Sequence, residues 1–189
     1  MKKINFNIKF NAKIGIFTIT GFFFLYLLYL SIPSLYDSGR VQKDLYNKLL
    51  KEFGFNLSLS SNIAYRILPE PHFHVKDAKI FGNKANSTDE IGQIKDAKVF
   101  ISQKNLFKRQ SINIKKVVLS KGNFFLNGEN VDFISDIFRN DFSKKKFLIK
   151  KSKLFFNDKN NSTIFIYTID NLNFLKNEKI NLQHFRTRG

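Results

Sequence analysis

Two histidines in one short stretch are the side chains whose type and spacing could bind a metal. His72 and His74 flank Phe73, and residues two apart on a β-strand share one face, as some metal-binding pairs do. Glu70 and Asp77 are near in sequence, but the pattern supplies no third ligand. We therefore expect no metal site, and we interpret both histidines as solvated side chains at a strand edge.

The common catalytic signatures are missing. The sequence contains no G-x-S-x-G, no Walker-type phosphate loop, no H-E-x-x-H and no cysteine nucleophile. Without cysteine the chain also has no disulfides and no thiolate metal ligands. We therefore predict that the protein is not an enzyme, with no catalytic residues and no cofactor.

The chain is strongly basic, with 32 Lys and Arg against 15 Asp and Glu and a formal net charge of +17. This excess predicts an anionic partner, namely nucleic acid, lipid headgroups or lipopolysaccharide. Nothing in the sequence resembles a basic recognition helix or an RNA-binding strand pair. We therefore expect membrane lipids, either phospholipid or another anionic lipid, and no nucleic acid.

Residues 14–32 read IGIFTITGFFFLYLLYLSI and carry no charge. A helix of this length spans roughly the 30 Å hydrocarbon core of a bilayer. Four lysines and no acid precede it, which by the positive-inside rule places the N-terminus in the cytoplasm. Tyr26, Tyr29 and Tyr36 lie where aromatic rings favour the membrane interface. The alternative is a cleaved signal peptide, whose apolar region is usually shorter and ends in an A-x-A-like site that is absent here.

Residues 37–53 have the pattern of an amphipathic helix that begins after Pro33. Asp37 or Ser38 can cap its N-terminus, and Gly54 suits the left-handed stop position. We expect the helix to pack over the end of the following sheet, with a position on the membrane surface as the alternative. Its apolar stripe consists of Val41, Leu45, Leu49 and Phe53.

From Phe55 onward the apolar period changes to two, which predicts strands. Pro69 and Pro71 cannot donate ladder hydrogen bonds, so they predict a strand end, a bend or an exposed edge. A short motif then recurs, which predicts repeated strands of one elongated sheet. Its copies are VKDAKIF from Val75, IKDAKVF from Ile94, IKKVVL from Ile114, IKKSKLF from Ile149 and IDNLNFL from Ile169. Residues from Val117 also align with those from Phe147 at an offset of 30, which matches Phe125 to Phe155.

Turns are expected between the apolar runs. Gly82-Asn83, Lys121-Gly122 and Asn127-Gly128 carry turn signals, and the last is a strong hairpin signal. We expect a polar loop over residues 86–90 and a short helix over residues 131–138. The fold class is therefore mainly β, with a transmembrane helix, one amphipathic helix and an elongated, repetitive, antiparallel, curved sheet. The expected parts are a cytoplasmic tail at 1–13, the span at 14–32, a linker and helix at 33–54, and a β domain at 55–189.

The order of these features resembles the N-terminal region of the AsmA-like proteins of the bacterial inner membrane. The likeness covers nearly the whole chain, including NLSLSSNIAYRILPEPHFHVKDAKIFG from Asn56 and NLFKRQSINIKKVVLSKGNFFL from Asn105. In the second stretch residues 105–107 look like the family's link, and residues 112–126 look like the strand pair that follows. Relatives are usually several times longer, so the chain matches only the anchored beginning of such a protein.

The resemblance implies a single-pass inner-membrane protein with a periplasmic β domain that acts in outer-membrane assembly or envelope phospholipid transport. Outer-membrane assembly proteins are then possible partners. An apolar groove would hold the acyl chains, although for each lining residue ordinary core packing is the alternative. A membrane-tethered protein that binds partners by strand addition is the alternative function. The groove candidates are Phe73, Val75, Ile80, Val99, Ile101, Phe124, Leu126, Leu154 and Phe156.

Overall fold

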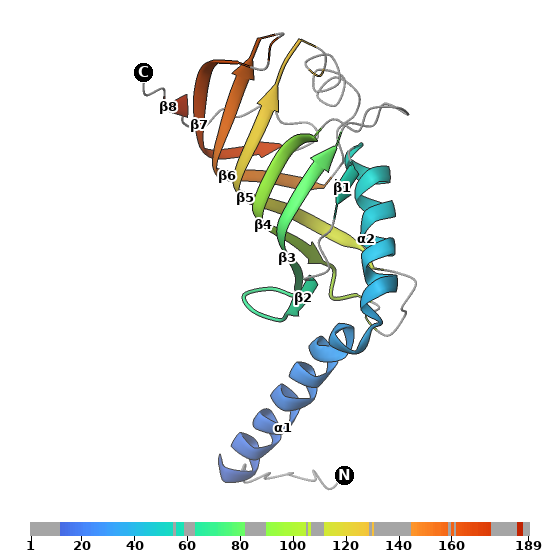
Figure 1. Ribbon diagram of the computed structural model, residues 1–189. Coiled ribbons are helices and arrows are strands. Elements are labelled where there is room, and N and C mark those ends of the chain that lie inside the picture. The colour runs from blue at the N-terminus through green and yellow to red at the C-terminus, as the bar shows by residue number, and fades with distance from the viewer. Residues whose placement is uncertain are drawn as a thin grey trace, which may run out of the picture.

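A computed structural model shows two helices followed by one β-sheet (Figure 1). It describes residues 12–54, 56–58, 63–81, 90–104, 106, 112–128, 130, 145–158, 160, 162–174 and 185–186. The expected polar loop is described only at Glu90, and the expected helix at 131–138 lies outside the described residues.

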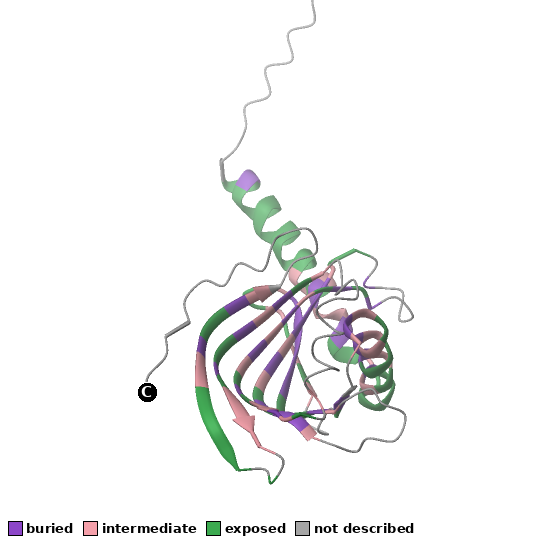
Figure 2. Ribbon diagram, turned by 90° about the horizontal axis from the view of Figure 1, so that it is seen from above, coloured by how far each residue is buried: buried purple, intermediate pink, exposed green. Residues whose placement is uncertain are grey.

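The N-terminal helix is long and apolar enough to cross a membrane. Helix α1 (Ala12–Ser31) continues into a 3-10 helix, η1 (Ile32–Leu35), and the apolar stretch runs over Lys13–Leu35. Most of its large side chains are exposed, including Phe17 at 84% and Phe22 at 69% (Figure 2), whereas Leu30 near its end is 5% exposed. A helix that is apolar on all sides is stable where lipid or protein surrounds it.

Helix α2 (Ser38–Phe53) confirms the amphipathic helix and both of its predicted ends. The Asp37 side chain accepts a hydrogen bond from the Arg40 N–H at 2.9 Å. Gly54 has a φ of 70°, and its N–H donates to the Leu50 carbonyl. All four residues of the predicted stripe are buried. The apolar stripe of the helix therefore packs against protein.

The eight strands form a single mixed sheet in the order β1-β3-β4-β5-β6-β7-β8, with β2 also paired to β3. The prediction of a mainly β, curved sheet is confirmed (Figure 2). Strand β2 ends at Arg66 and β3 begins at His72, so Pro69 and Pro71 lie between strands as expected. The strands are β1 (Asn56–Ser58), β2 (Ile63–Arg66), β3 (His72–Phe81), β4 (Glu90–Ile101), β5 (Ile114–Leu126), β6 (Lys146–Asn157), β7 (Thr163–Phe174) and β8 (Phe185–Arg186).

Strands β5 and β6 pair in parallel, whereas we expected an antiparallel sheet throughout. The predicted hairpin at Asn127-Gly128 is therefore wrong, because a hairpin would make the next strand antiparallel. Residues 127–145 are long enough for the crossover that a parallel pair requires. The register pairs Val117 with Phe147 and Phe125 with Phe155, so it equals the offset of the sequence repeat.

The predicted turn at Lys121-Gly122, and with it the strand pair over residues 112–126, is also wrong. β5 is one continuous strand, and Lys121 has a φ of 56° in its interior. A left-handed residue there bends the strand without reversing it. Asp77 in β3 and Lys151 in β6 have φ values of 51° and 48°.

In each of the five long strands, β3 to β7, two consecutive residues face outward at or beside these left-handed positions. We call the row that these residue pairs form across the sheet the step line. Register places Lys76 beside Asp96, Asp96 beside Ser120, Ser120 beside Lys150, and Lys150 beside Asn171. The residues on either side of each pair are buried, so the alternation of the strand shifts by one. The step line consists of Lys76-Asp77, Lys95-Asp96, Ser120-Lys121, Lys150-Lys151 and Asp170-Asn171.

The step line explains the sequence repeat. The motifs from Val75, Ile94, Ile149 and Ile169 all cross it, the first two on the neighbouring strands β3 and β4 and the last two on the neighbouring strands β6 and β7. The motif from Ile114 does not, because Ile114 begins β5 opposite Ile101 and the matching residue is Leu119. We call the part of the sheet that contains the start of β5 the near half, and the part that contains its end the far half.

Ser152 completes the hydrogen bonding where the parallel ladder is interrupted. Its Oγ accepts from the buried Gly122 N–H at 3.0 Å and donates to the Lys150 carbonyl at 2.9 Å. A Cβ on Gly122 would lie 2.6 Å from the Ile94 Cδ1, so glycine alone fits without displacement. The two strands are therefore fastened at the bend by one side chain.

Helix α2 covers one face of the curved sheet, which we call the inner face (Figure 2). The rings of Phe53 and Phe147 lie 5.5 Å apart, and the Lys145 Nζ lies 2.9 Å from the Glu52 carboxylate. The core beneath α2 includes residues from β1, β3, β4, β5, β6 and β7. The near half is thereby closed by the helix.

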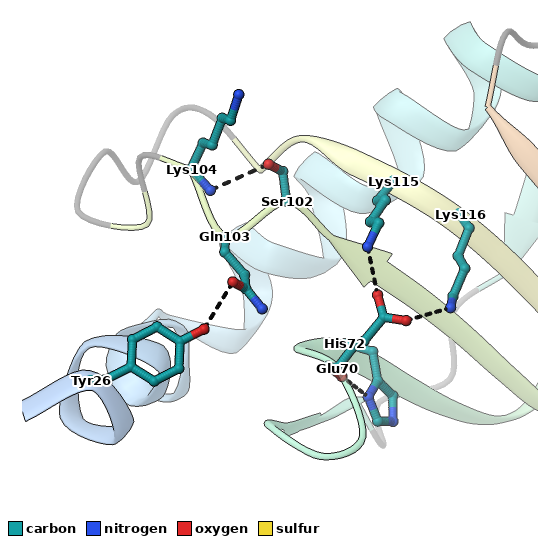
Figure 3. Close-up of polar contacts among 8 residues, drawn as sticks. All are labelled: Tyr26, Glu70, His72, Ser102, Gln103, Lys104, Lys115 and Lys116. Atoms are coloured by element: carbon teal, nitrogen blue, oxygen red, sulfur yellow. Dashed lines mark hydrogen bonds and ion pairs between the residues drawn. The ribbon is translucent and has the colours of Figure 1, made fainter. Parts of the chain in front are cut away.

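Tyrosines fasten α1 and η1 to the turn that follows β4. Tyr26 and Tyr29 donate to the side chain and the carbonyl of Gln103 at 3.0 and 2.6 Å (Figure 3). From β2, the Tyr65 hydroxyl donates to the Leu30 carbonyl at 2.6 Å. Burial raises the pKa of Tyr65 to about 12, so this donor stays protonated at neutral pH. The apolar helix is therefore docked on the β domain.

The loop between β2 and β3, residues 67–71, folds over the outer face and is held by one carboxylate. Glu70 accepts from the Lys115 and Lys116 Nζ atoms, each at 2.8 Å (Figure 3). The Lys116 Nζ also lies 4.1 Å from the centre of the Phe100 ring. The hydrogen bonds from Lys115 and Lys116 lower the pKa of Glu70 to about 2.

We predict that Ser152→Ala lowers the free energy of unfolding by about 1 to 3 kcal/mol, because it leaves the buried Gly122 N–H without an acceptor. Urea unfolding of the full chain in detergent, followed by circular dichroism, measures this. Ser120→Ala is the matched control, since Ser120 is half-buried in the step line, and it should change stability by less than about 0.5 kcal/mol. Equal effects of the two substitutions would refute the role of Ser152.

We predict that Glu70→Gln destabilises the protein at neutral pH by no more than about 1 kcal/mol, since the pair is partly exposed to water. The folded pKa of about 2 lies below the ordinary value of 4.5, so the stabilisation is present above pH 4.5 and lost as pH falls towards 2. The difference in urea stability between wild type and variant should therefore shrink over that range. A difference independent of pH would contradict this assignment.

Candidate functional site

The two histidines lie in the sheet and are not solvated, so our interpretation of them is wrong. His72 is 1% exposed and His74 is 7% exposed. The His72 Nδ1–H donates to the Glu70 carbonyl at 2.7 Å, and its ring stacks on Phe100 at 4.9 Å. His74 Nε2 lies 2.9 Å from the Asp96 carboxylate. Sequence patterns missed the burial of both rings because their partners come from outside β3, the Glu70 carbonyl of the loop for His72 and Asp96 of β4 for His74.

These histidines have structural partners and no metal-binding geometry. Burial is the largest cause that lowers the pKa of His72, so its ring is neutral at pH 7. Within the described part of the chain, no three His, Cys, Asp or Glu side chains cluster as metal ligands.

The nine groove candidates all face the inner side of the sheet, but they fall into two groups. Register aligns Phe73 with Val99, and Phe124 with Leu154. The first group is closed core, each residue being at most 6% exposed: Phe73, Val75, Ile80, Val99 and Ile101. The second group lies at the far ends of β5 and β6: Phe124, Leu126, Leu154 and Phe156. Within the second group, Phe124, Leu154 and Phe156 are half-buried and are candidates for a ligand surface, whereas Leu126 is 7% exposed and is as buried as Ile80.

The second group continues onto β7 as two inner rows, which we call the distal patch. One row is Phe124, Leu154 and Tyr167, and the other is Leu126, Phe156 and Phe165. The Phe156 ring stacks on Phe165 at 4.1 Å, and Phe165 meets Tyr167 edge to face at 5.2 Å. Phe165 is nevertheless 44% exposed.

The outer face is also apolar beyond the step line. Phe125, Phe155 and Ile166 form a row there, and the rings of Phe125 and Phe155 stack at 5.5 Å. On the adjoining strand, Ile164 is 67% exposed and Ile166 is 46% exposed. The far ends of β5, β6 and β7 lie at the end of the molecule opposite α1 (Figure 1).

We did not predict the β7 residues of the distal patch, although a signal for them exists. Residues 164–169 read IFIYTI, in which apolar side chains fill both faces of a strand. Our prediction for this strand used only the repeat motif from Ile169, which lies at the other end of the strand. Register with β6 then places Phe165 and Tyr167 beside the candidates.

The fold and the site together define a mainly β domain joined to an N-terminal helix that is long and apolar enough to span a membrane. Neither a search of protein-family models nor a search of curated proteins found a match for this chain. Function must therefore be argued from the chain's own residues.

We predict that the two groups of candidates differ in what they contribute to stability. Phe73→Ala should cost about 3 to 5 kcal/mol, as expected for a large ring removed from a closed core. Phe156→Ala should cost about 1 to 2 kcal/mol, because its site is open to solvent and leaves no sealed cavity. Urea unfolding of both variants gives the comparison. A loss at Phe156 as large as that at Phe73 would mean that the distal patch is sealed core.

Proposed function

We propose that this chain is an AsmA-like inner-membrane protein whose periplasmic β domain holds acyl chains of phospholipid, or of another anionic lipid, on the distal patch. In this proposal α1 is a single-pass anchor with the N-terminus in the cytoplasm. The biological role is outer-membrane assembly or envelope phospholipid transport, and it needs no covalent chemistry.

The observation that carries the proposal is the exposure of Phe165 among the half-buried rings of the distal patch. Phe165 remains 44% exposed beside the Phe156 and Tyr167 rings, on the face that α2 closes elsewhere. Burying an acyl chain on such a surface is worth about 0.8 kcal/mol for each methylene group. Aromatic and aliphatic side chains without charge are the lining that an acyl chain prefers.

Charge and position also favour a lipid ligand. The chain's net charge of +17 attracts anionic headgroups to the domain as a whole. The inner face is apolar from the closed core under α2 out to the distal patch, since Phe124 and Leu154 contact that core. A lipid bound at the far end would therefore lie on a continuous apolar surface rather than in an isolated pocket.

A second candidate function is strand addition at the edge of β7. Among the described residues, only Thr168 and Ile169 of β7 pair with β8, so the edge over residues 163–167 has no described partner strand. The side chain of Ile166 makes the outer face of this edge apolar as well. Lipid bound on the inner face would leave Ile166 exposed to water. A protein strand would instead extend the sheet and allow both faces to be covered.

Photo-crosslinking of the full chain in membranes separates these functions. A benzophenone amino acid at Phe165 reports the inner face, and one at Ile166 is the matched control, with 44% and 46% exposure on opposite faces. We predict phospholipid adducts at position 165 and several-fold fewer at position 166, measured by mass spectrometry. Protein adducts at both positions would favour strand addition. No lipid adduct at position 165 would reject the lipid proposal.

A further inference from the structure

Two leucines close to the end of α1 are almost fully exposed. Leu35 is 78% exposed and Leu68 is 77% exposed, more than the 67% of Ile164 at the far end. Leu35 is the last residue of η1, and Leu68 lies in the loop between β2 and β3. Both leucines are therefore outside the apolar core of the β domain.

The loop that carries Leu68 is held beside the end of α1. Tyr65 at the end of β2 donates to the Leu30 carbonyl, and Leu68 follows three residues later, within roughly 11 Å along the chain. Figure 1 shows the loop between β2 and β3 at the end of the sheet nearest α1. Leu35 and Leu68 therefore lie near the level at which the apolar helix ends.

The loop has partners that fix it in this position. The Ile101 N–H donates to the Pro71 carbonyl at 3.1 Å, and Glu70 binds Lys115 and Lys116. These contacts are on the domain side, and Leu68 projects away from the core despite them. Exposed leucines are common on protein surfaces, and Leu68 differs from most of them in lying beside the end of a long apolar helix.

Two basic side chains lie in segments next to this end of α1. Arg66 ends β2, and Lys104 follows Gln103, the residue that binds Tyr26 and Tyr29; both basic side chains are exposed. Neither Arg66 nor Lys104 forms an ion pair within the described residues. Figure 3 shows the Lys104 side chain extending away from the pair formed by Tyr26 and Gln103. Cations next to exposed leucines are the composition of a surface that binds an anionic membrane.

We infer that this end of the β domain is a membrane-docking surface, formed by Leu35, Leu68, Arg66 and Lys104, that lies on the bilayer crossed by α1. Leu35 and Leu68 enter the interface between headgroups and acyl chains, and Arg66 and Lys104 bind the phosphates of anionic phospholipid. The inference rests on the proposed span of α1 and does not depend on lipid at the distal patch. Its consequence is a β domain held at a fixed orientation to the membrane, because the tyrosines fasten α1 to the same surface.

The absence of cysteine makes this inference directly measurable, since one introduced cysteine carries the only label. The probe is a polarity-sensitive fluorophore on the full chain, placed in vesicles of zwitterionic phospholipid with phosphatidylglycerol and a lipid spin-labelled near its headgroup. Leu68→Cys reports the docking surface, and Ile164→Cys is the matched control with similar exposure at the far end. Phe23→Cys, 60% exposed within α1, reports the span itself.

We predict that the Leu68→Cys probe emits at shorter wavelength than the Ile164→Cys probe and is quenched by the spin-labelled lipid, whereas the Ile164→Cys probe is not. Omitting phosphatidylglycerol, or adding Arg66→Glu and Lys104→Glu, should reduce the quenching at position 68. Lys153→Glu with Lys146→Glu is the control for loss of charge, since both lysines are exposed in β6, and should leave that quenching unchanged.

Two results would overturn the inference in distinguishable ways. If the Phe23→Cys probe is shifted to shorter wavelength but Leu68→Cys behaves like Ile164→Cys, the span stands and the docking surface does not exist. If the Phe23→Cys probe also stays in water, the anchor itself fails. Neither result depends on lipid adducts at Phe165, which test the distal patch separately.

Discussion

The structure depends on a single departure from strand alternation that is repeated across the sheet. In each long strand two consecutive residues face outward at the step line, and the apolar residues on either side then face inward together. A step in one strand alone would shift the hydrogen-bond register of that strand relative to its neighbours. Because five strands make the step at the same level, the ladder continues across it, and the sheet bends as a unit. Three of the strands use a left-handed residue at this point, and the Ser152 hydroxyl replaces the ladder bond that the parallel pair loses there.

The bend divides the sheet into parts with different surroundings. In the near half, α2 closes the inner face through its buried stripe, and the loop at residues 67–71 covers His72 on the outer face. In the far half, apolar side chains of β6 and β7 stay partly exposed on both faces, Phe156 and Phe165 on the inner face and Phe155 and Ile166 on the outer face. The charged step line lies between the two. Its exposed side chains keep the outer face solvated at the bend, while beyond it the outer row becomes Phe125, Phe155 and Ile166.

Sequence patterns predicted the structural features that depend on residues close together in the chain. The apolar helix, both ends of α2 and the strand pattern depend on residues close together in the chain, and the structure confirms them. Alternation accounts for the direction of the groove candidates only within each half of the sheet, because Ile80 shares a face with Phe73 and Val75 through the step at Lys76-Asp77. Several errors concern contacts between distant segments: Glu70 lies 45 residues from Lys115, and no periodicity predicts that its loop buries a histidine. The turn predicted at Lys121-Gly122 is a local error, because the left-handed residue there bends β5 without reversing it. The parallel pair is a different case, because the repeat at an offset of 30 already contained its register, and the turn signal at Asn127-Gly128 was given more weight.

The two exposed apolar regions differ in what they require from their surroundings. At the α1 end, single exposed leucines and exposed basic side chains lie in the segments next to the helix. This composition suits a bilayer interface, where leucine can contact acyl chains and a basic side chain can bind phosphate. At the far end, rows of side chains continue across three strands, and a strand that is apolar on both faces is stable when both are covered. A strand of 13 residues such as β5 covers about 40 Å, so a bilayer crossed by α1, as we propose, would not reach the distal patch without a large tilt of the domain. The near half is therefore closed core joined to the apolar helix α1, and the far half is where a lipid or a further strand would cover the exposed apolar side chains.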